Sequence, residues 1–203
     1  MPAIQQQTIA LPQPRRKGKM SIEEAIRARR SRRAYSSQPV SLADAGQLLW
    51  AAQGITGPEK QRTAPSAGAL YPLELYLSAA RVEGLAPGIY KYDPEEHQLI
   101  PHVAGERRRE LTAAANDQDC MRFSACALLF AAVRERTEAK YEGRAPRFIC
   151  IETGHAVANV YLQAAALGLG TCIVGAFDPD AAARVAELPP EEEIVCLMTA
   201  GCL

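Results

Sequence analysis

The stretch Glu152–Asp178, with the sequence ETGHAVANVYLQAAALGLGTCIVGAFD, decides the fold. Nearly every residue of 156–167 is apolar, and the polar residues His155, Asn159 and Gln163 stand four positions apart, so the segment predicts a helix with one polar stripe. A helix this apolar is expected to be buried on most sides, either in a domain centre or in a subunit interface.

The small residues after this helix predict a sharp turn into a strand. Gly168 is placed to end the helix in the left-handed conformation, and Gly170 lets the chain turn into a strand at 171–174. Gly175 and Ala176 then leave a backbone with almost no side chain in front of a ligand. Two interpretations stay open: a backbone that faces a flat cofactor, and a core helix followed by an ordinary tight turn.

Periodicity and capping signals predict the remaining elements. Ser21 with Glu24 forms a capping box that opens a helix, and the fully apolar run 126–133 predicts a central strand buried on both faces. The other predicted segments are helices at 42–53 and 106–115, strands at 73–79, 88–92, 98–100 and 194–200, a loop at 56–68 and a charged loop at 134–147.

Length and composition indicate one domain in a soluble, cytoplasmic protein. The 203 residues are 48% hydrophobic and 23% charged, which is ordinary for a globular chain. Residues 1–20 hold three prolines and little periodicity, so we expect an extended N-terminal arm before a single domain at 21–203. No secretory leader is recognisable, and no segment approaches the ~18 uninterrupted apolar residues of a membrane span.

Charge and cysteine usage argue against several kinds of partner. The 23 basic and 23 acidic residues balance, so no global field attracts nucleic acid or membrane. The six cysteines are scattered through apolar runs without a CxxC pair or a histidine at ligand spacing, and they are predicted to be buried, reduced thiols rather than metal ligands.

A dense basic cluster follows the first predicted helix. Arg29, Arg30, Arg32 and Arg33 surround the hydroxyl of Ser31. Because a guanidinium binds phosphate oxygens with two donors and keeps its charge, the cluster favours an anion site. A solvated helix end and a nucleic-acid patch, together with the RRKGK run at 15–19, are the alternatives.

Two further features are weaker signals of function. The loop PSAGALYP at 65–72 offers small residues around a hydroxyl, which permits close approach to a planar ring. His155 could act as a base or ligand, or could simply be a satisfied residue at the start of the helix. No Walker motif, Rossmann glycine pattern or ordered Ser/His/Asp set is present, which argues against ATP chemistry and hydrolysis.

Four motifs in order make the chain resemble the nitroreductase superfamily of FMN-dependent oxidoreductases, especially its SagB-type azoline dehydrogenase branch. These motifs are RRSRRAY at 29–35, PSAGALYPLE at 65–74, GIYKYD at 88–93 and GHAVANVYLQAAALGLG at 154–170. The resemblance implies an α+β fold with a mostly antiparallel sheet flanked by helices. It also implies an intertwined homodimer that carries two FMN sites at its interface.

The resemblance also assigns roles to single residues. Lys140 and Tyr141 resemble a catalytic Lys-Tyr pair that handles protons in the azoline dehydrogenases. The implied FMN-binding residues are Arg29, Arg30, Ser31 and Arg33 at the phosphate and the pyrimidine edge, Pro65, Ser66, Ala67, Gly68 and Leu70 in a loop that the other subunit lays along the cofactor, Gln118 beside the ring, and Ile173, Val174 and Gly175 as the backbone facing the flavin.

The implied activity is ping-pong electron or hydride transfer between NAD(P)H and a small organic acceptor such as a nitroaromatic or a quinone. A SagB-type dehydrogenase that oxidises azoline heterocycles in peptides is one alternative. A dimer that binds FMN without catalysis is the other. In each case the expected partners are a second copy of the chain and a small molecule, with no metal, nucleic acid or membrane.

Overall fold

The computed structural model describes residues 7–203, so residues 1–6 of the predicted arm lie outside the described part of the chain. The rest of the arm runs against the sheet, because Ile9–Ala10 form a short strand, β1, and Leu11 is buried in the core. The arm is then held by Gln47, whose side-chain amide accepts from the Arg15 amide at 2.7 Å and donates to the Arg15 carbonyl at 3.1 Å.

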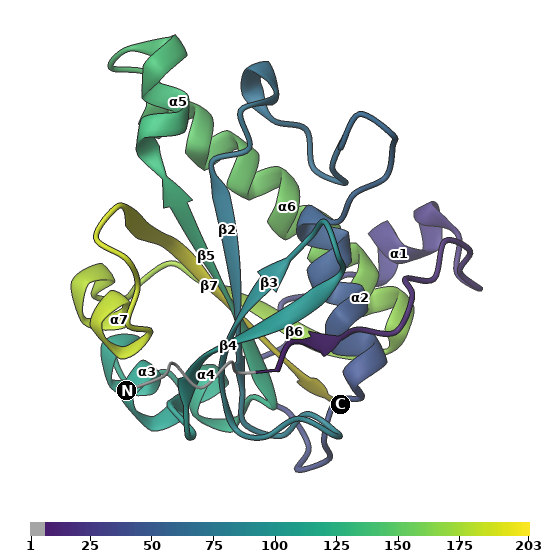
Figure 1. Cartoon of the computed structure of the whole chain (residues 1–203). Helices are drawn as coiled ribbons and strands as arrows, with labels where there is room; N and C mark the ends of the chain where they lie inside the picture. The colour runs from purple at the N-terminus through teal and green to yellow at the C-terminus, as the bar shows by residue number, and fades with distance from the viewer. Residues whose placement is uncertain (1–6) are drawn as a thin grey trace.

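A seven-stranded sheet forms the centre of the molecule, and each neighbouring pair of its strands is antiparallel (Figure 1). The strands stand in the order β1-β4-β3-β2-β5-β7-β6. After β1 they are β2 (Leu73–Ala79), β3 (Gly88–Asp93), β4 (Gln98–Ala104), β5 (Cys126–Val133), β6 (Leu169–Val174) and β7 (Glu192–Cys202).

Helices cover both faces of this sheet, which confirms the predicted α+β class (Figure 1). One hydrophobic core lies between the sheet and helices α2 and α6, and a second lies between the opposite face and α3, α4 and α7. The helices are α1 (Ile22–Ala28), α2 (Leu42–Gln53), the 3-10 turn η1 (Ala67–Ala69), α3 (Arg108–Ala114), α4 (Asp119–Phe123), α5 (Arg134–Tyr141), α6 (Ala145–Leu167) and α7 (Pro179–Val185).

Strand β5 belongs to both cores, as its uninterrupted apolar sequence predicts. Leu128 and Phe130 point into the core under α2 and α6, whereas Ala127 and Leu129 point into the other core. All four side chains are 2% exposed or less, because β5 is paired on both edges, with β2 and with β7. Apolar residues on both faces are therefore required here.

The predicted charged loop at 134–147 is wrong, because most of it is helical. Residues 134–141 form α5, and α6 begins at Ala145 rather than near residue 156. The run is rich in Arg, Glu, Ala and Lys, which are good helix formers, and Arg134 and Glu138 form an i,i+4 ion pair at 3.4 Å. The helix was not predicted because most of its residues are exposed to solvent, and such a helix has no apolar stripe.

Helix α6 is 23 residues long, and it is buried on only one side of the described chain. Its buried face includes Ala156, Val160 and Ala164, which pack in the core with α2 and the sheet. Its open face carries exposed residues such as Ile151, Gly154 and Ala158. The expected burial on most sides is thus not reached within one chain.

The predicted polar stripe of α6 does not lie on the open face. Asn159 is half-buried and donates to the Thr63 carbonyl at 3.1 Å, and the half-buried Gln163 accepts from Gln47 at 3.1 Å. Only His155 of the stripe is exposed. The open face of α6 is therefore made mainly of small and apolar residues.

Several local predictions are confirmed and one is not. The capping box of Ser21 and Glu24 opens α1, and Gly168 ends α6 at φ 73°. All six cysteines are free thiols, but Cys150 is exposed and Cys202 is partly exposed, so the prediction that all six are buried is wrong for these two.

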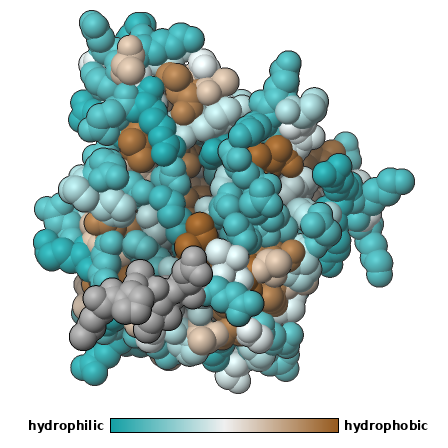
Figure 2. Space-filling view, in the orientation of Figure 1, coloured by the Kyte–Doolittle hydropathy of each residue, from teal (hydrophilic) through white to brown (hydrophobic). Residues whose placement is uncertain are grey.

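On the face shown in Figure 2, hydrophobic residues are scattered among hydrophilic ones rather than gathered in one patch. Within residues 7–203, no helix combines the length and the apolar character needed to cross a membrane.

Candidate functional site

The arginine cluster lies on the edge strand of the sheet. Its segment 29–35 runs beside β6, where Ser31 forms a parallel bridge with Thr171 and the Arg32 amide donates to the Thr171 carbonyl at 2.9 Å. One residue beyond the segment, the Ser36 amide donates to the Cys202 carbonyl at 2.9 Å. The backbone of the cluster is therefore fixed by the sheet, although the cluster follows a helix of only seven residues.

The ring of Tyr35 fixes the far end of this segment. It lies on Gly170 and Gly201, which face each other in β6 and β7, and a Cβ at either glycine would come within about 3.0 Å of the ring. The Tyr35 hydroxyl donates to the Arg32 carbonyl at 2.7 Å and hydrogen-bonds the Thr199 hydroxyl at 2.6 Å. These glycines are needed because the ring occupies the place of their side chains.

Tyr161, on α6, joins three parts of the cluster, and the sequence analysis missed it. Its hydroxyl hydrogen-bonds the Ser31 hydroxyl at 3.0 Å and accepts from the Ile173 amide at 2.9 Å. The Arg29 guanidinium lies 5.4 Å from the centre of its ring. A buried tyrosine hydroxyl usually has a hydrogen-bond partner, so a tyrosine in an otherwise apolar helix could have predicted a polar contact here.

The guanidiniums of the cluster have no carboxylate partner anywhere in residues 7–203. No ion pair is formed by Arg29, Arg30, Arg32 or Arg33, and only Arg30 folds back, onto the carbonyls of Arg27 and Arg29. Like charges this close repel one another unless an anion lies between them. The donors suit the oxygens of a phosphate group. We call Arg29–Tyr35 with Tyr161 and Ile173 the arginine site.

The strand end beside the arginine site is open. The Ile173 side chain is 41% exposed, Val174 is buried, and Gly175 is exposed with no atom within 4 Å of an added Cβ. The Ile173 amide already donates to Tyr161, so a hydrogen bond to a flat ligand would have to come from the amides further along the chain.

Gln118 braces this open backbone from α4. Its Nε2 donates to the Ala176 carbonyl at 2.9 Å and to the Ala115 carbonyl at 3.0 Å, and Asn116 donates to the same Ala176 carbonyl at 3.1 Å. Both amide protons of Gln118 are thus used to hold the turn. Its carbonyl oxygen is the group that remains for a ligand.

The predicted loop and the predicted Lys-Tyr pair lie together. In the segment 65–70 the chain makes the turn η1, and Gly68 adopts a φ of 63°. A Cβ on Gly68 would lie 2.9 Å from the Lys140 Nζ and 3.0 Å from the Tyr141 hydroxyl oxygen. We call Pro65–Leu70 with Lys140 and Tyr141 the loop site. Its members Pro65, Ser66, Ala67, Gly68 and Leu70 are exposed or half-buried.

Aromatic and cationic neighbours surround the Tyr141 ring. It packs on Phe148 with ring centres 4.5 Å apart, and the Lys140 and Arg144 cations lie 5.7 and 5.8 Å from its centre. The phenol and the ammonium therefore stand side by side at the tip of the α5–α6 hairpin, where both can reach a ligand.

The arginine site and the loop site lie at opposite ends of α6 (Figure 1). Phe148 packs beside the loop site near the start of the helix, and Tyr161 belongs to the arginine site near its end. At about 1.5 Å per residue, these positions are about 20 Å apart along the helix axis. One chain therefore does not bring the predicted binding residues into a single site.

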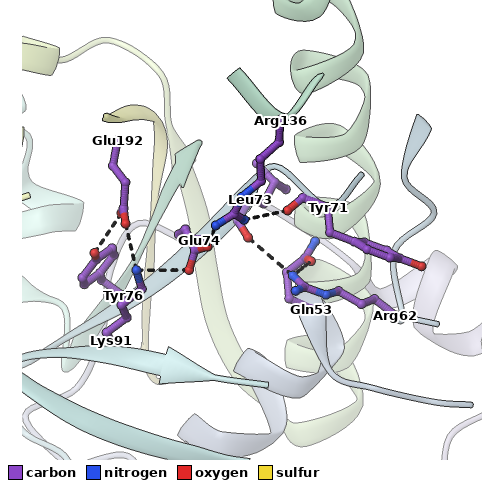
Figure 3. A network of polar contacts seen from close by, with 9 residues as sticks. All are labelled: Gln53, Arg62, Tyr71, Leu73, Glu74, Tyr76, Lys91, Arg136 and Glu192. Atoms are coloured by element: carbon purple, nitrogen blue, oxygen red, sulfur yellow. Dashed lines mark hydrogen bonds and ion pairs between the residues drawn. The ribbon is translucent and has the colours of Figure 1, made fainter. Parts of the chain in front are cut away.

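A network of polar contacts connects the loop with the sheet (Figure 3). Arg136, on α5, donates to the Tyr71 carbonyl at 2.9 Å and to Glu74 on β2 at 2.6 Å. Lys91 then links Glu74, at 3.2 Å, to Glu192, at 2.8 Å. Arg136 thereby holds α5, the end of the loop and β2 in one arrangement.

Tyr76, Lys91 and Glu192 form one end of this network (Figure 3), and Tyr76 and Glu192 are buried. Tyr76 is fully buried, and burial together with its bond to Glu192 raises the pKa of its hydroxyl. Burial lowers the pKa of Lys91, but the carboxylates of Glu192 and Glu74 raise it by more, so the net change is upward. The lysine is held in its charged form, as its two carboxylate partners require.

Other potential sites have less support. Across residues 7–203, no group of three or more His, Cys, Asp or Glu side chains is placed to hold a metal ion. His155 is exposed on α6.

Comparisons with known proteins agree with this geometry. The chain matches the nitroreductase family over residues 26–202. A protein of Methanocaldococcus jannaschii that is named among the nitroreductases is 42% identical over 158 residues, which cover 78% of this chain and 80% of that protein.

Solved structures show the same fold. A nitroreductase crystal structure from Ralstonia eutropha superposes with a TM-score of 0.85 at 29% identity, covering 98% of this chain and 90% of that one. The NADPH:FMN oxidoreductase of Vibrio harveyi, solved in complex with NAD⁺, has a TM-score of 0.64 at 18% identity, covering 89% of this chain and 68% of that one, and it supports the fold alone. With its strand order, its arginine segment on β6 and this match over most of its length, the chain belongs to the nitroreductase family.

Proposed function

We propose that the protein is an FMN-dependent oxidoreductase that takes electrons from NAD(P)H and passes them to a small organic acceptor such as a nitroaromatic or a quinone. One observation carries the proposal: four arginines without a carboxylate partner in residues 7–203 belong to a segment that Tyr161 links to Ile173, two residues before the open backbone at Gly175, in a chain of the nitroreductase family. The Vibrio harveyi relative in fold is named for NADPH and FMN, which supports the same cofactors here.

The residues present fit a phosphorylated flavin. Arg29, Arg30 and Ser31 would hold the phosphate, and Arg33 would face the pyrimidine edge of the ring. The backbone of 173–175, braced by Gln118, would lie along the ring. When bound, FMN supplies the acceptance and donation of electrons, while the protein supplies binding, orientation and electrostatics.

We infer that the protein acts as a homodimer, because the open face of α6 continues onto α1. Ile22 and Ile26 are 55% and 59% exposed, and Ile151 is 46% exposed. A hollow of about 360 Å³ lies between the two helices and is lined by Ile26, Arg29, Gly154, Val157, Ala158, Tyr161 and Leu162. Exposed apolar side chains around an apolar hollow favour a protein partner.

A two-fold axis would also complete the site. If the α6 helices of two copies pack antiparallel, the loop site at the start of one helix meets the arginine site at the end of the other. Pro65–Leu70 of one protomer would then lie along the cofactor that the arginines of its partner hold. Lys140 and Tyr141 stand at this loop, so they are the groups we assign to proton delivery to the acceptor.

The absorbance spectrum tests the proposal first. Protein incubated with FMN and then desalted is expected to be yellow, and anaerobic mixing with NADPH or NADH is expected to bleach the flavin band. Protein that stays colourless after incubation with FMN contradicts the proposal. A flavin that no hydride donor bleaches favours the alternative of a dimer that holds FMN without catalysis.

The placement of Lys140 and Tyr141 at Gly68 also favours a second candidate, a SagB-type dehydrogenase that oxidises azoline heterocycles in peptides. Such an enzyme removes a hydride and a proton from the ring, and the pair offers a base beside the loop. Flavin reduction by an azoline-containing peptide in the absence of NAD(P)H supports this candidate. Flavin reduction by NAD(P)H alone supports the first.

A further inference from the structure

Helix α5 carries Lys140 and Tyr141 of the loop site, but little of this helix is buried. Among its residues Arg134–Tyr141, only Thr137 is buried. A helix with so little apolar contact has few interactions that fix its position on the molecule. Apart from the ring contact of Tyr141 with Phe148, the position of the two side chains therefore depends on polar contacts of α5.

Arg136 joins α5 to the end of the loop and to the sheet (Figure 3). Its Nη1 donates to the Tyr71 carbonyl at 2.9 Å, and its Nη2 donates to the Glu74 carboxylate at 2.6 Å. Glu74 belongs to β2, which pairs with β5 along its whole length, so its backbone is a fixed point. The planar fork of one arginine thus ties the loop and α5 to the same strand.

The neighbouring charges hold the Glu74 side chain in place as well (Figure 3). Its Oε2 lies 3.2 Å from the Lys91 Nζ, which also lies 2.8 Å from the Glu192 carboxylate. Without Arg136, Glu74 would still be paired with Lys91, so a substitution at position 136 leaves no carboxylate without a cation. The Arg136 side chain is 41% exposed, and so open an ion pair contributes little to the stability of the whole fold.

The backbone at Tyr71 depends on the contacts of this residue. Its φ is 46°, in the left-handed region that residues with a side chain rarely adopt, and such a conformation persists only where the surroundings hold it. The Tyr71 amide donates to the Ser66 hydroxyl at 2.9 Å, and the Tyr71 ring lies 4.8 Å from the Arg62 guanidinium. The third contact, at the carbonyl, is the one that comes from α5.

The same face of α5 meets the loop at a second point. Arg136 and Lys140 are four positions apart in the helix, so their side chains lie one above the other. Arg136 contacts Tyr71 at the end of the loop, and the Lys140 Nζ lies 2.9 Å from the place of a Cβ on Gly68. Fixing the first contact therefore also fixes where Lys140 stands over the loop.

We propose that Arg136 is a positioning residue for the loop site. Its two-armed guanidinium docks α5 on the Tyr71 carbonyl and Glu74, and this docking holds Lys140 and Tyr141 against the loop. The inference rests on the proposed function, in which these two residues deliver a proton to the acceptor. Arg136 acts only through them. Its loss should loosen the loop and α5 and slow the step that needs the proton, while the rest of the fold stays as stable as before.

Hydrogen exchange in the flavin-free full chain tests the docking. Arg136→Leu is compared with Arg134→Leu, because Arg134 lies on the same helix, is 48% exposed and pairs with Glu138 of that helix. The amides of residues 66–71 are expected to exchange about tenfold faster in Arg136→Leu, the effect of one lost hydrogen bond, and at the unaltered rate in Arg134→Leu. The amides of β3 and β4 should keep their rates in both variants.

Arg136→Lys separates the fork from the charge. Lysine keeps a cation beside Glu74, but its single nitrogen does not reproduce the planar fork that reaches two acceptors. The urea midpoint should therefore stay at that of the unaltered protein, while residues 66–71 exchange as fast as in Arg136→Leu. Unaltered exchange in Arg136→Lys would overturn the proposal. So would a lower midpoint of Arg136→Leu with exchange that is equally faster in β3 and β4, because Arg136 would then only stabilise the whole fold.

A measurement with flavin distinguishes this proposal from the proposed function. Reoxidation by a quinone moves a hydride from the flavin to the quinone, and the proton that completes the hydroquinone comes from Lys140 or Tyr141. In stopped-flow experiments, Arg136→Leu is expected to slow this reoxidation about tenfold, because the proton donors are misplaced. Flavin reduction by NADPH, which takes no proton from this pair, should keep its rate, and Arg134→Leu should keep both rates.

The two measurements fail separately. If the unaltered protein binds no FMN and the exchange difference appears, the proposed function is wrong and the docking by Arg136 stands. If FMN binds and Arg136→Leu changes neither the exchange of residues 66–71 nor the rate of reoxidation, the positioning role is wrong and the proposed function stands.

Discussion

The arginine site and the loop site lie on the same helix but are built in opposite ways. The arginine site is an extended segment on the sheet edge, bridged to β6 at Ser31 and Arg32, and three of its four arginines are exposed. The loop site has left-handed residues at Gly68, Ala69 and Tyr71. Its Ser66 hydroxyl accepts from the Tyr71 amide at 2.9 Å and closes the turn.

This difference indicates which part of each site, side chains or backbone, is expected to bind the ligand. In the arginine site the chemistry belongs to side chains, so single truncations should remove single interactions with a ligand. In the loop site the chemistry depends on a backbone conformation, so residues that never touch a ligand can matter as much as those that do. The predictions below test this contrast, from the largest expected effect to the smallest.

The largest effect is expected from a charge on the open face that we assign to the dimer. Ala158→Glu or Ala165→Glu should prevent assembly and release FMN from both sites at once, because a buried unpaired carboxylate costs about 3 kcal/mol or more, while each Å² of apolar contact contributes only about 25 cal/mol. Light scattering and bound flavin measure the outcome. Ala113→Glu, at an exposed position of α3, is the control. A flavin-loaded monomer of Ala158→Glu or Ala165→Glu would contradict the prediction.

Within the arginine site, Arg29 is expected to affect mainly the affinity for FMN, and Arg33 mainly the reduction potential of the flavin. Arg29→Ala is expected to weaken FMN by about 2 kcal/mol, the contribution of a charge-assisted hydrogen bond, without changing the reduction potential of the residual flavin. Arg33→Ala is expected to lower that potential and slow hydride uptake at saturating FMN. Titration and potentiometry of both variants decide the question. Equal potentials with equal losses of affinity would show that Arg33 only holds phosphate.

The Tyr161 hydroxyl should stabilise the arginine site but leave the loop site unaffected. Tyr161→Phe removes its bonds to Ser31 and to the Ile173 amide and is expected to cost about 1 kcal/mol of unfolding free energy and a few-fold in FMN affinity. Tyr90→Phe removes one hydroxyl bond, to the Ala86 carbonyl at 2.7 Å, and serves as control. It should lower stability similarly with no effect on FMN. Equal FMN affinities in the two variants would refute the role of Tyr161.

The smallest effect is a pH dependence of stability that arises from the buried carboxyl group of Glu152 on α6. The folded pKa of Glu152 is raised above its ordinary value of 4.5, so the folded protein binds this proton more tightly than the unfolded chain does. The associated stability is fully present below pH 4.5 and is lost as pH rises through the raised pKa. The free energy of unfolding in urea, measured at several pH values, should fall with rising pH more in the unaltered protein than in Glu152→Gln. Parallel pH curves for the two proteins would rule it out.

Much of the fold was predictable because its signals are local. The Ser21 and Glu24 capping box, the apolar run of β5 and Gly168 after α6 each predict their element from neighbouring residues. Helix α5 was missed because its charged sequence carries no apolar stripe, and only its packing on α6 distinguishes it from a loop.

The site was predictable only where its side chains form a recognisable motif. The segment 29–35 stands out by its charge, and Lys140 and Tyr141, which the resemblance singled out, lie beside Gly68 of the predicted loop. The contacts of Tyr161 could not be predicted, because this residue reaches partners far away in the sequence and lies in a helix that looks like ordinary core. That Ile173 donates to Tyr161 rather than to a ligand is equally a property of the folded chain.

The central claim is that each flavin lies between the arginine site of one chain and the loop site of its partner. Two variants should each lose FMN binding. The double variant Arg29→Ala with Arg33→Ala breaks the arginine site. Gly68→Val breaks the loop site, because a β-branched residue does not adopt a φ of 63° and its side chain would collide with Lys140. When equal amounts are unfolded and refolded together, mixed dimers hold one intact site, so bound FMN should rise to about one per four chains. A mixture that binds no more FMN than the two variants bind separately would contradict the claim.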